Sequence, residues 1–283
     1  MKILAIGDFH GKFPVKLRRL AKKVDLIVCI GDYFSFTNRD LFFKYSYRTN
    51  RELWEVVGKK KVKAGILKDF RAGESILKKL DKVGVPVITV IGNVDYTRVN
   101  DVFDEEKVGW HRTWKWENQD FFSPIVKKYK NIHRFDYAYA KFGGLDFIGA
   151  YGHTFPGKVK SKAYKKYRGI LEKLFKKFRK ENRRGDVIFV AHNVPYDCKL
   201  DKIRDEDAPV EVQGKHYGSK LIRRVIDKHQ PVLALGGHMH ENQGKCKIGK
   251  TLVVNPGAAI DGKCAIIDFD VDKGRIKSVK FVK

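Results

Sequence analysis

The chain has 283 residues, of which 43% are hydrophobic and 33% are charged, a balance typical of a globular protein. No apolar run approaches the roughly 18 residues that a membrane span needs, and the N-terminal apolar stretch is shorter than that of a secretory signal, so we expect a cytoplasmic protein. Lysine and arginine number 59 against 33 aspartates and glutamates, and the formal net charge of +26 predicts polyanionic partners, nucleic acid above all.

Short β-branched runs followed by polar clusters recur along the chain, and each run predicts a strand. Amphipathic stretches between several of them predict helices, for example at 15–24 and 73–84. The final strands follow one another too closely for crossover helices, so part of the architecture must be antiparallel. We therefore expect a layered α/β sandwich with sheets covered on both faces. The predicted strands lie at 2–7, 25–31, 85–92, 142–152, 186–192, 231–237, 251–257 and 264–270.

Three long stretches interrupt this pattern, and we interpret them as insertions into a single domain that spans residues 1–283. They lie at about 34–75, 102–130 and 156–185. The first is rich in aromatic residues, the second contains three of the four tryptophans, and the third is strongly basic. We expect the three insertions to surround a common mouth.

Polar side chains follow five of the predicted strands, at the point where each strand ends. In open α/β sheets the ligand crevice lies at the carboxyl ends of the strands, so these side chains are expected to converge. Imidazoles together with carboxylate and carboxamide oxygens suit a pair of divalent transition metals. Two ions bridged by a carboxylate and held roughly 3.5–4 Å apart can clamp a displacement at phosphorus. The residues are Asp8, His10, Asp32, Asn93, Asp95, His192, His238 and His240.

Each of these residues alone has an ordinary structural explanation. Asp32 could cap a helix, and Asn93 could occupy a left-handed turn. Five motifs that each follow a strand, and that each supply a compatible ligand, make coincidence a poor explanation. The sequence therefore predicts a dinuclear metal site.

With these motifs the sequence resembles the calcineurin-like metallophosphoesterases. The motifs read GDFHG, IGDYF, GNVD, AHNVP and GGHMHENQG, and the resemblance runs from residue 1 to about 270. A closer likeness to the Icc-related predicted phosphoesterases rests on HNVPYD, HYGSKLIRRVIDKHQPVLALGGHMHE and TLVVNPG, and it is weaker around 34–75 and 156–185. The resemblance implies a layered α/β/β/α sandwich with mixed sheets and inserted helical segments.

The resemblance also implies which residues hold each ion. One ion is bound by Asp8, His10 and His240, the other is bound by Asn93, His192 and His238, and Asp32 bridges the two. We expect Asp95 to orient a neighbouring ligand without binding metal itself. The ions would be Mn, Fe, Zn or Ni, with Mn favoured. Catalysis would depend most directly on Asp32, Asn93 and His192.

Val94 stands where the family usually has a histidine that contacts the phosphate or protonates the leaving group. An isopropyl group can do neither, so the usual general acid is missing at this position. In-line attack by a hydroxide that bridges the two ions does not need that imidazole. His153 and His216 are candidate proton donors, although for each the interpretation as a hydrogen-bonded loop histidine is favoured.

The basic insertion is predicted to be a helix with one apolar face. Residues 158–185 contain 13 lysines or arginines and two glutamates, and apolar side chains recur at helical spacing at Tyr167, Ile170 or Leu171, Leu174 and Phe178. The helix could be a solvated face packed on the core, or it could lie on an anionic membrane. We expect it to contact nucleic acid, with tryptophans as stacking platforms. The residues concerned are Lys165, Lys166, Lys176, Lys177, Trp110, Trp114 and Trp116.

These features favour a dinuclear metal-dependent phosphodiesterase or nuclease that acts on nucleic acid or nucleotides. A small-molecule phosphodiesterase or phosphatase is the alternative within the same class, because the ligands alone do not select the ester. A catalytically weak metal-binding scaffold is the alternative outside it, and Val94 is the feature that suggests it.

Overall fold

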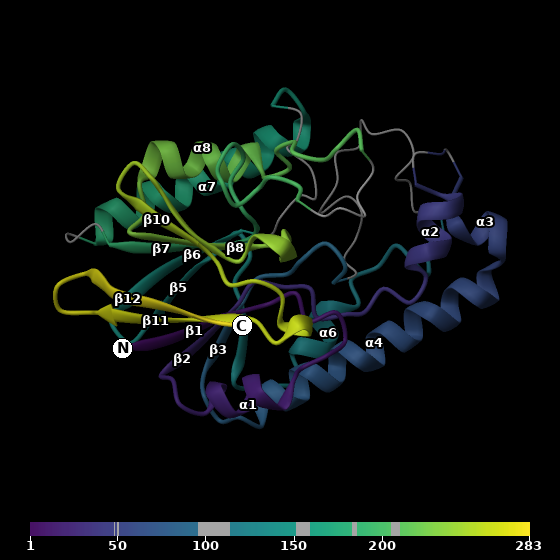
Figure 1. Cartoon of the computed structure of the whole chain (residues 1–283), viewed down its shortest axis with the longest axis horizontal. Coiled ribbons are helices and arrows are strands. Elements are labelled where there is room, and N and C mark those ends of the chain that lie inside the picture. The colour runs from purple at the N-terminus through teal and green to yellow at the C-terminus, as the bar shows by residue number, and fades with distance from the viewer. Residues whose placement is uncertain (48, 50, 96–113, 151–158, 183–185, 205–209) are drawn as a thin grey trace.

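Two six-stranded mixed sheets form the centre of the protein in its computed structural model. The structure describes residues 1–47, 49, 51–95, 114–150, 159–182, 186–204 and 210–283. The two sheets lie face to face, and helices cover their outer faces (Figure 1). This arrangement confirms the predicted α/β/β/α sandwich.

The first sheet has the strand order β12-β11-β1-β2-β3-β4. Strands β1 to β4 run parallel to one another, while β11 is antiparallel to β1 and β12 is antiparallel to β11. The bounds are β1 (Lys2–Ile6), β2 (Leu26–Cys29), β3 (Val87–Thr89), β4 (Ile132–Arg134), β11 (Cys264–Asp270) and β12 (Arg275–Val282).

The second sheet has the strand order β5-β6-β7-β8-β10-β9. Its four inner strands are parallel, and the two edge strands β5 and β9 are antiparallel to their neighbours. The bounds are β5 (Tyr139–Phe142), β6 (Leu145–Ala150), β7 (Val187–Asn193), β8 (Leu233–Gly237), β9 (Gly244–Ile248) and β10 (Thr251–Asn255).

Side chains of the inner strands alternate between two buried layers. Ile3 and Ala5 of β1 pack between the sheets, whereas Leu4 and Ile6 of the same strand face the helices. Both faces are therefore apolar, which explains the near-continuous hydrophobic runs in the sequence. Burial of each such side chain contributes roughly 1.5–3 kcal/mol.

Helices α1 (Val15–Ala21), α4 (Lys59–Asp81) and α6 (Phe122–Val126) cover the first sheet, and α7 (Lys162–Glu181) and α8 (Lys220–His229) cover the second (Figure 1). Two shorter helices, α2 (Arg39–Tyr45) and α3 (Leu53–Val57), precede α4. Two 3-10 turns, η1 (His240–Asn242) and η2 (Ala259–Asp261), follow β8 and β10. Among the described residues, no helix has the length and apolar character required to cross a membrane.

Helix α4 is longer than the sequence indicated. The helix expected over 73–84 begins instead at Lys59 and runs for 23 residues. Two glycines within it are points of close packing: a Cβ added at Gly73 would lie 1.7 Å from Phe34 Cδ1, and one added at Gly65 would lie 2.4 Å from Asn38 Nδ2. The glycines therefore let α4 pass directly beneath the segment that follows Asp32.

Helix α7 occupies most of the basic insertion. Its amino end is capped by Ser161, whose hydroxyl accepts the N–H of Tyr164 at 3.1 Å. The buried stripe includes Phe175 where we expected Leu174, which is half-buried. The stripe comprises Tyr164, Tyr167, Leu171, Phe175 and Phe178.

Candidate metal centre

The predicted ligands converge at the carboxyl ends of strands from both sheets. Two sets of three side chains each place ligand atoms within 4.8 Å of one another. The first set is Asp8, His10 and His240, and the second is Asp32, His192 and His238. Asn93 joins the second set, because its Oδ1 lies 2.7 Å from His192 Nε2 and 2.9 Å from His238 Nδ1.

Four of these residues have a left-handed backbone. The φ angles are 53° at Asp8, 42° at His10, 58° at Asp32 and 70° at His238. Such values are uncommon outside glycine, although aspartate and histidine tolerate them better than most residues. Backbone strain of this kind concentrates at functional sites, where the surrounding structure has to hold it in place.

Backbone hydrogen bonds join the segment after β1 to the segment after β2. Asp8 N donates to Gly31 O at 2.9 Å, and the amides of Phe9 and His10 both donate to Asp32 O, at 2.8 and 3.0 Å. These bonds bring the side chains of Asp8 and His10 next to that of Asp32.

Two glycines leave room for the carboxylates. A Cβ added at Gly237 would lie 2.5 Å from Asp8 Oδ2, and one added at Gly92 would lie 2.0 Å from Asp32 Oδ1. A larger residue at either position would displace a carboxylate from the centre. The glycines of the strand-end motifs are thus explained by close approach to a ligand.

In the first set, ring nitrogens of two histidines and a buried carboxylate oxygen point to a common space. His10 Nε2 lies 3.2 Å from His240 Nε2, and His240 Nε2 lies 3.5 Å from Asp8 Oδ1. Asp8 Oδ1 is buried, and among the described residues no donor reaches it with hydrogen-bond geometry. Burial acts to lower the pKa of His240, but the Asp8 and Asp32 carboxylates outweigh it and raise that pKa to about 9. Such an arrangement of donor atoms fits a bound cation.

In the second set, one hydrogen bond fixes which nitrogen of His192 is available. Its Nδ1 lies 2.8 Å from Ile30 O, a carbonyl that can only accept, so Nδ1 carries the proton. In the neutral ring Nε2 then presents a lone pair to Asn93 Oδ1, which is also an acceptor. A cation between these two atoms would satisfy both. Orientation of a metal-binding histidine through its other nitrogen is common in metal sites.

Asp32 lies between the two sets. Its Oδ2 is 3.6 Å from His10 Nε2 and 3.5 Å from His192 Nε2. Its Oδ1 accepts the backbone N–H of Val94 at 3.0 Å. The position of Oδ2 is therefore suited to a carboxylate shared by two ions.

Asp95 is fully buried and contacts the backbone near the ligands. Its Oδ2 accepts the amides of Asp32 and Gly92 at 2.7 and 2.8 Å, and its Oδ1 accepts those of Tyr33 and Phe34 at 2.7 and 3.3 Å. Burial and the nearby Asp32 carboxylate raise the pKa of Asp95 to about 7, against the lowering effect of the backbone donors. The carboxylate thereby joins the segments that follow β2 and β3.

Of the two candidate proton donors, the structure describes His216 alone. His153 lies outside the described residues. His216 Nδ1 lies 2.6 Å from Asp201 Oδ1, and its Nε2 lies 3.6 Å from Asp197 Oδ1. Asp201 is fully buried and also accepts backbone amides from residues 197, 198 and 218. These contacts match the interpretation of His216 as a hydrogen-bonded loop histidine.

The residues expected to contact nucleic acid lie on different elements. The four lysines are exposed on α7, where Lys177 pairs with Glu181 at 3.8 Å. Trp114 and Trp116 are half-buried, with ring centroids 5.0 Å apart, whereas Trp110 lies outside the described residues. Sequence reasoning missed Trp54 as a neighbour of these rings, because no local signal links it to residues 60 positions away.

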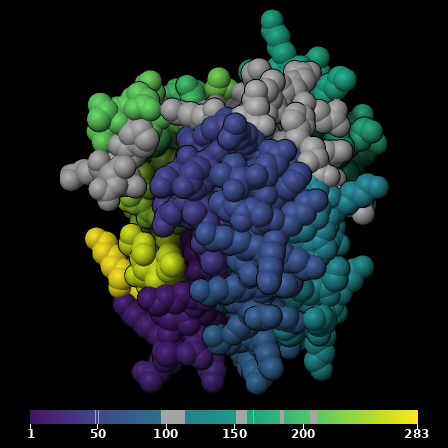
Figure 2. Space-filling view, turned by 90° about the vertical axis from the view of Figure 1, so that its right-hand side faces the viewer, coloured from purple at the N-terminus to yellow at the C-terminus, as the bar shows by residue number. Residues whose placement is uncertain are grey.

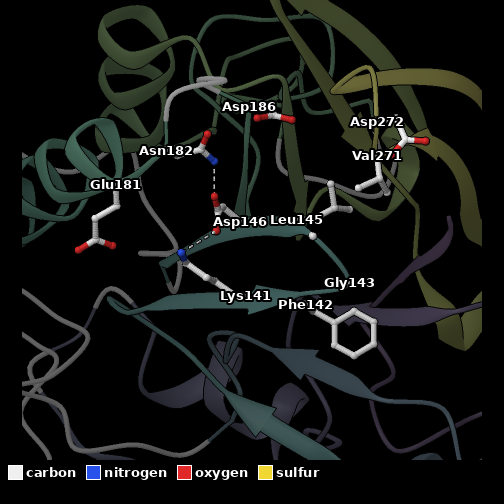
Figure 3. A pocket seen from close by; sticks show the side chains of 11 residues that line it. Lys141, Phe142, Gly143, Leu145, Asp146, Glu181, Asn182, Asp186, Val271 and Asp272 are labelled. Atoms are coloured by element: carbon white, nitrogen blue, oxygen red, sulfur yellow. Dashed lines mark hydrogen bonds and ion pairs between the residues drawn. The ribbon is translucent and has the colours of Figure 1, made fainter.

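A separate pocket of about 580 Å³ lies at the opposite end of the second sheet (Figure 3). It is lined by the start of β6 and by residues just before β7, whereas the ligand His192 lies near the carboxyl end of β7. Four of its eleven lining residues are acidic, and one of them, Asp146, contacts Asn182 and Lys141. The pocket is therefore distinct from the metal centre.

Two mixed sheets enclosed by helices, with paired ligand sets at the strand ends, define a metallophosphoesterase sandwich. The family model for calcineurin-like phosphoesterases matches residues 1–242, and the chain belongs to that family. It is accordingly a metal-dependent phosphoesterase with a dinuclear divalent metal site.

Individual proteins are similar to this chain over nearly its whole length. An uncharacterized protein of Methanocaldococcus jannaschii, MJ1162, is 25% identical over 261 residues, which cover 90% of this chain and 88% of the relative. One crystal structure is similar with a TM-score of 0.66 and 19% identity, covering 100% of this chain and 98% of its own. The crystal structure of TT1561 of Thermus thermophilus has a TM-score of 0.52 and 15% identity, with the same coverage. The two solved structures support the fold alone.

Proposed function

We propose that the protein is a phosphodiesterase or nuclease that acts on nucleic acid or nucleotides in the cytoplasm, as a single domain with manganese as the preferred ion. The observation that carries the proposal is the position of Asp32, whose Oδ2 lies within 3.6 Å of imidazoles from both ligand sets. These distances support a role for the Asp32 carboxylate as a ligand that two ions would share.

In this proposal each ion has three ligands of its own and one in common. Asp32 is the shared ligand. When bound, the two ions supply a nucleophile at neutral pH and neutralise the charge that develops on the phosphoryl oxygens. The first ion is held by Asp8, His10 and His240, and the second is held by Asn93, His192 and His238.

Three further groups of the chain prepare the site. The Ile30 carbonyl keeps the proton of His192 on Nδ1, so that Nε2 would be available to bind the second ion. Asp95 fixes the backbone of Asp32 and Gly92 through two hydrogen bonds and thereby positions the shared ligand. Val94 contributes its backbone N–H to Asp32 and offers no proton to a leaving group.

The missing proton donor favours certain esters. A phosphate ester with a poor alkyl leaving group needs protonation at the leaving oxygen, and Val94 cannot provide it. We therefore propose a preference for diesters and for activated leaving groups over unactivated alkyl monoesters. The net charge of +26 supports a polyanionic substrate among the preferred diesters.

The proposal is tested by supplying Mn²⁺ to the metal-depleted protein and comparing substrates. The substrates are bis(p-nitrophenyl) phosphate, p-nitrophenyl phosphate and labelled single- and double-stranded oligonucleotides, with Asp32→Asn as the control for contaminating activity. We expect the small diester to be hydrolysed faster than the small monoester, and at least one oligonucleotide to be cleaved. Hydrolysis of the small diester without cleavage of any oligonucleotide would favour a small-molecule phosphodiesterase, and no hydrolysis at all would favour a metal-binding scaffold.

A further inference from the structure

Three tryptophans and two lysines form a continuous surface at the amino end of α4. This tryptophan-lysine surface consists of Trp54 of α3, Lys59 and Lys63 of α4, and Trp114 and Trp116 from the segment before α6. We propose that it binds single-stranded nucleic acid outside the metal centre. The proposal rests on the proposed action on nucleic acid and names a second place where that substrate is held.

The contacts within the surface join three separate segments of the chain. Lys59 Nζ lies 4.5 Å from the ring centroid of Trp54 and 5.7 Å from that of Trp114. Lys63 Nζ lies 4.8 Å from the centroid of Trp116, and the Trp114 and Trp116 rings are 5.0 Å apart. The indoles are half-buried and both lysines are exposed. The indoles also pack against the hydrophobic core, so it is their exposed part that lies beside the two lysines.

The charge at this end of α4 is not explained by helix stability. Four lysines occupy the first five positions, and no acidic residue lies in the first turn. Positive charge at a helix amino end opposes the helix dipole. Within the part of the chain that the structure describes, none of the four is within ion-pair distance of a carboxylate. The lysines are Lys59, Lys60, Lys61 and Lys63.

This combination fits a single strand better than other anions. Surfaces that bind single strands pair cations for the phosphates with aromatic rings on which bases stack. A duplex hides the faces of its bases, and a small phosphate has no use for indoles. The amphipathic indole with neighbouring lysines could also rest on anionic lipid, and that occupant is one outcome of the test below.

Helix α4 connects the surface to the metal centre. A Cβ at Gly11, which follows His10, would lie 3.2 Å from Ala72 Cβ, so the middle of α4 adjoins the loop that carries the first ligands. Lys59 precedes Ala72 by thirteen residues, which at 1.5 Å per residue is roughly 20 Å. At the 3.4 Å axial spacing of stacked nucleotides, that span corresponds to about six nucleotides. Helices α2, α3 and α4 form one continuous face in Figure 2, drawn in indigo to blue.

The tryptophans themselves report binding. The chain has four tryptophans, and three of them belong to the tryptophan-lysine surface. We therefore expect most of the intrinsic fluorescence of the chain to come from this surface. We would titrate the full chain carrying Asp32→Asn, which prevents cleavage, with a 12-nucleotide oligothymidylate and with an abasic 12-mer of equal charge. We expect the oligothymidylate to quench the emission and to bind at least fivefold more tightly than the abasic strand.

Variants then locate the contact. Trp114→Leu with Trp116→Leu is expected to weaken oligothymidylate binding about five- to 150-fold for each stacked base that is lost. Binding of the abasic strand should be unchanged. The control is Lys78→Gln, at the other end of α4. In the Asp32-containing background the double variant should retain turnover of the small diester, which also shows that it is folded.

The length of the strand gives an independent result. Cleavage of a trinucleotide should not depend on Trp114 and Trp116, whereas cleavage of strands longer than about six nucleotides should. Equal affinity for the oligothymidylate and the abasic strand would overturn the proposal. So would emission changes with phosphatidylglycerol vesicles but none with oligothymidylate.

Failure of the surface and failure of the enzymatic proposal are distinguishable. Tryptophan-dependent binding without oligonucleotide cleavage would support the proposed binding surface and contradict the proposed nuclease activity. Oligonucleotide cleavage with binding that does not depend on the tryptophans would support the nuclease activity and contradict the proposed binding surface.

Discussion

Replacement of Asp95 by asparagine should cost the protein a large part of its stability. The carboxylate accepts four backbone amides, from Asp32, Gly92, Tyr33 and Phe34. An asparagine keeps one acceptor oxygen, and its NH₂ group then faces two donors. Loss of two hydrogen bonds to a charged group, at roughly 1.5–3 kcal/mol each, gives about 3–6 kcal/mol. Because the pKa of Asp95 is raised to about 7, its charge opposes folding at higher pH, so the neutral asparagine recovers part of this loss and the net cost falls towards the lower end of that range. Native domains are stable by only about 5–15 kcal/mol.

The assay is guanidinium unfolding of the metal-depleted protein at pH 8, where Asp95 is ionised because its pKa is about 7. The matched control is Asp25→Asn, whose carboxylate accepts one amide, from Lys2, at an exposed position. We expect the control to lose less than about 1 kcal/mol. If Asp95→Asn unfolds within about 0.5 kcal/mol of the parent protein and still binds two ions, the positioning role assigned to this carboxylate is wrong.

Three further predictions concern the ligands, the leaving group and the basic helix. Asp32→Asn and, separately, His238→Ala should abolish diester hydrolysis and reduce bound metal, measured by plasma mass spectrometry; two tight ions with full activity in both would contradict the ligand assignment. Val94→His should raise turnover of alkyl esters more than that of nitrophenyl esters in steady-state kinetics, and equal gains would remove the argument from Val94. Neutralising four exposed lysines of α7 should flatten the dependence of log affinity on log salt by about one to three units, at roughly 0.7 per phosphate contact, without changing small-diester turnover. Unchanged affinity and slope would show that these lysines do not contact the strand. The four lysines are Lys165, Lys166, Lys176 and Lys177.

The parallel core could be predicted from the sequence because both faces of its strands are buried. Strand β7 has seven buried residues in succession, and β6 has six. A strand that is buried on both faces therefore consists of consecutive apolar residues, which are visible in the sequence. Once the strands are placed, topology gathers their carboxyl ends, so the convergence of Asp8, Asp32 and His192 followed from the strand assignments.

The edges of the sheets could not be predicted in the same way. Strands β5, β9 and β12 are partly exposed along much of their length, so their side chains follow no strong apolar run. Strand β4 has only three residues. The early start of α4 was hidden by Gly65 and Gly73, which weaken a local helix signal. The two glycines are needed because Asn38 and Phe34 approach α4 closely. Sequence spacing does not reveal these contacts.

Within the metal centre, residue types could be predicted but their partners could not. The proton on His192 is fixed by the backbone carbonyl of Ile30, 162 residues earlier. Asp95 acts on backbone amides, which every residue has and no motif marks. Lys59 contacts the rings of both Trp54 and Trp114, and α3 lies against α4. Each of these contacts depends on segments brought together by the complete fold.

The central claim is that two divalent ions held at the strand ends carry out phosphodiester hydrolysis. The most direct test is a titration of metal-depleted protein with Mn²⁺, in which bound metal and hydrolysis of bis(p-nitrophenyl) phosphate are measured on the same samples. We predict saturation at two ions per chain, with activity that rises as the second ion binds and is absent in Asp32→Asn. Full activity in the metal-depleted protein, or no activity with two ions bound, would contradict the claim.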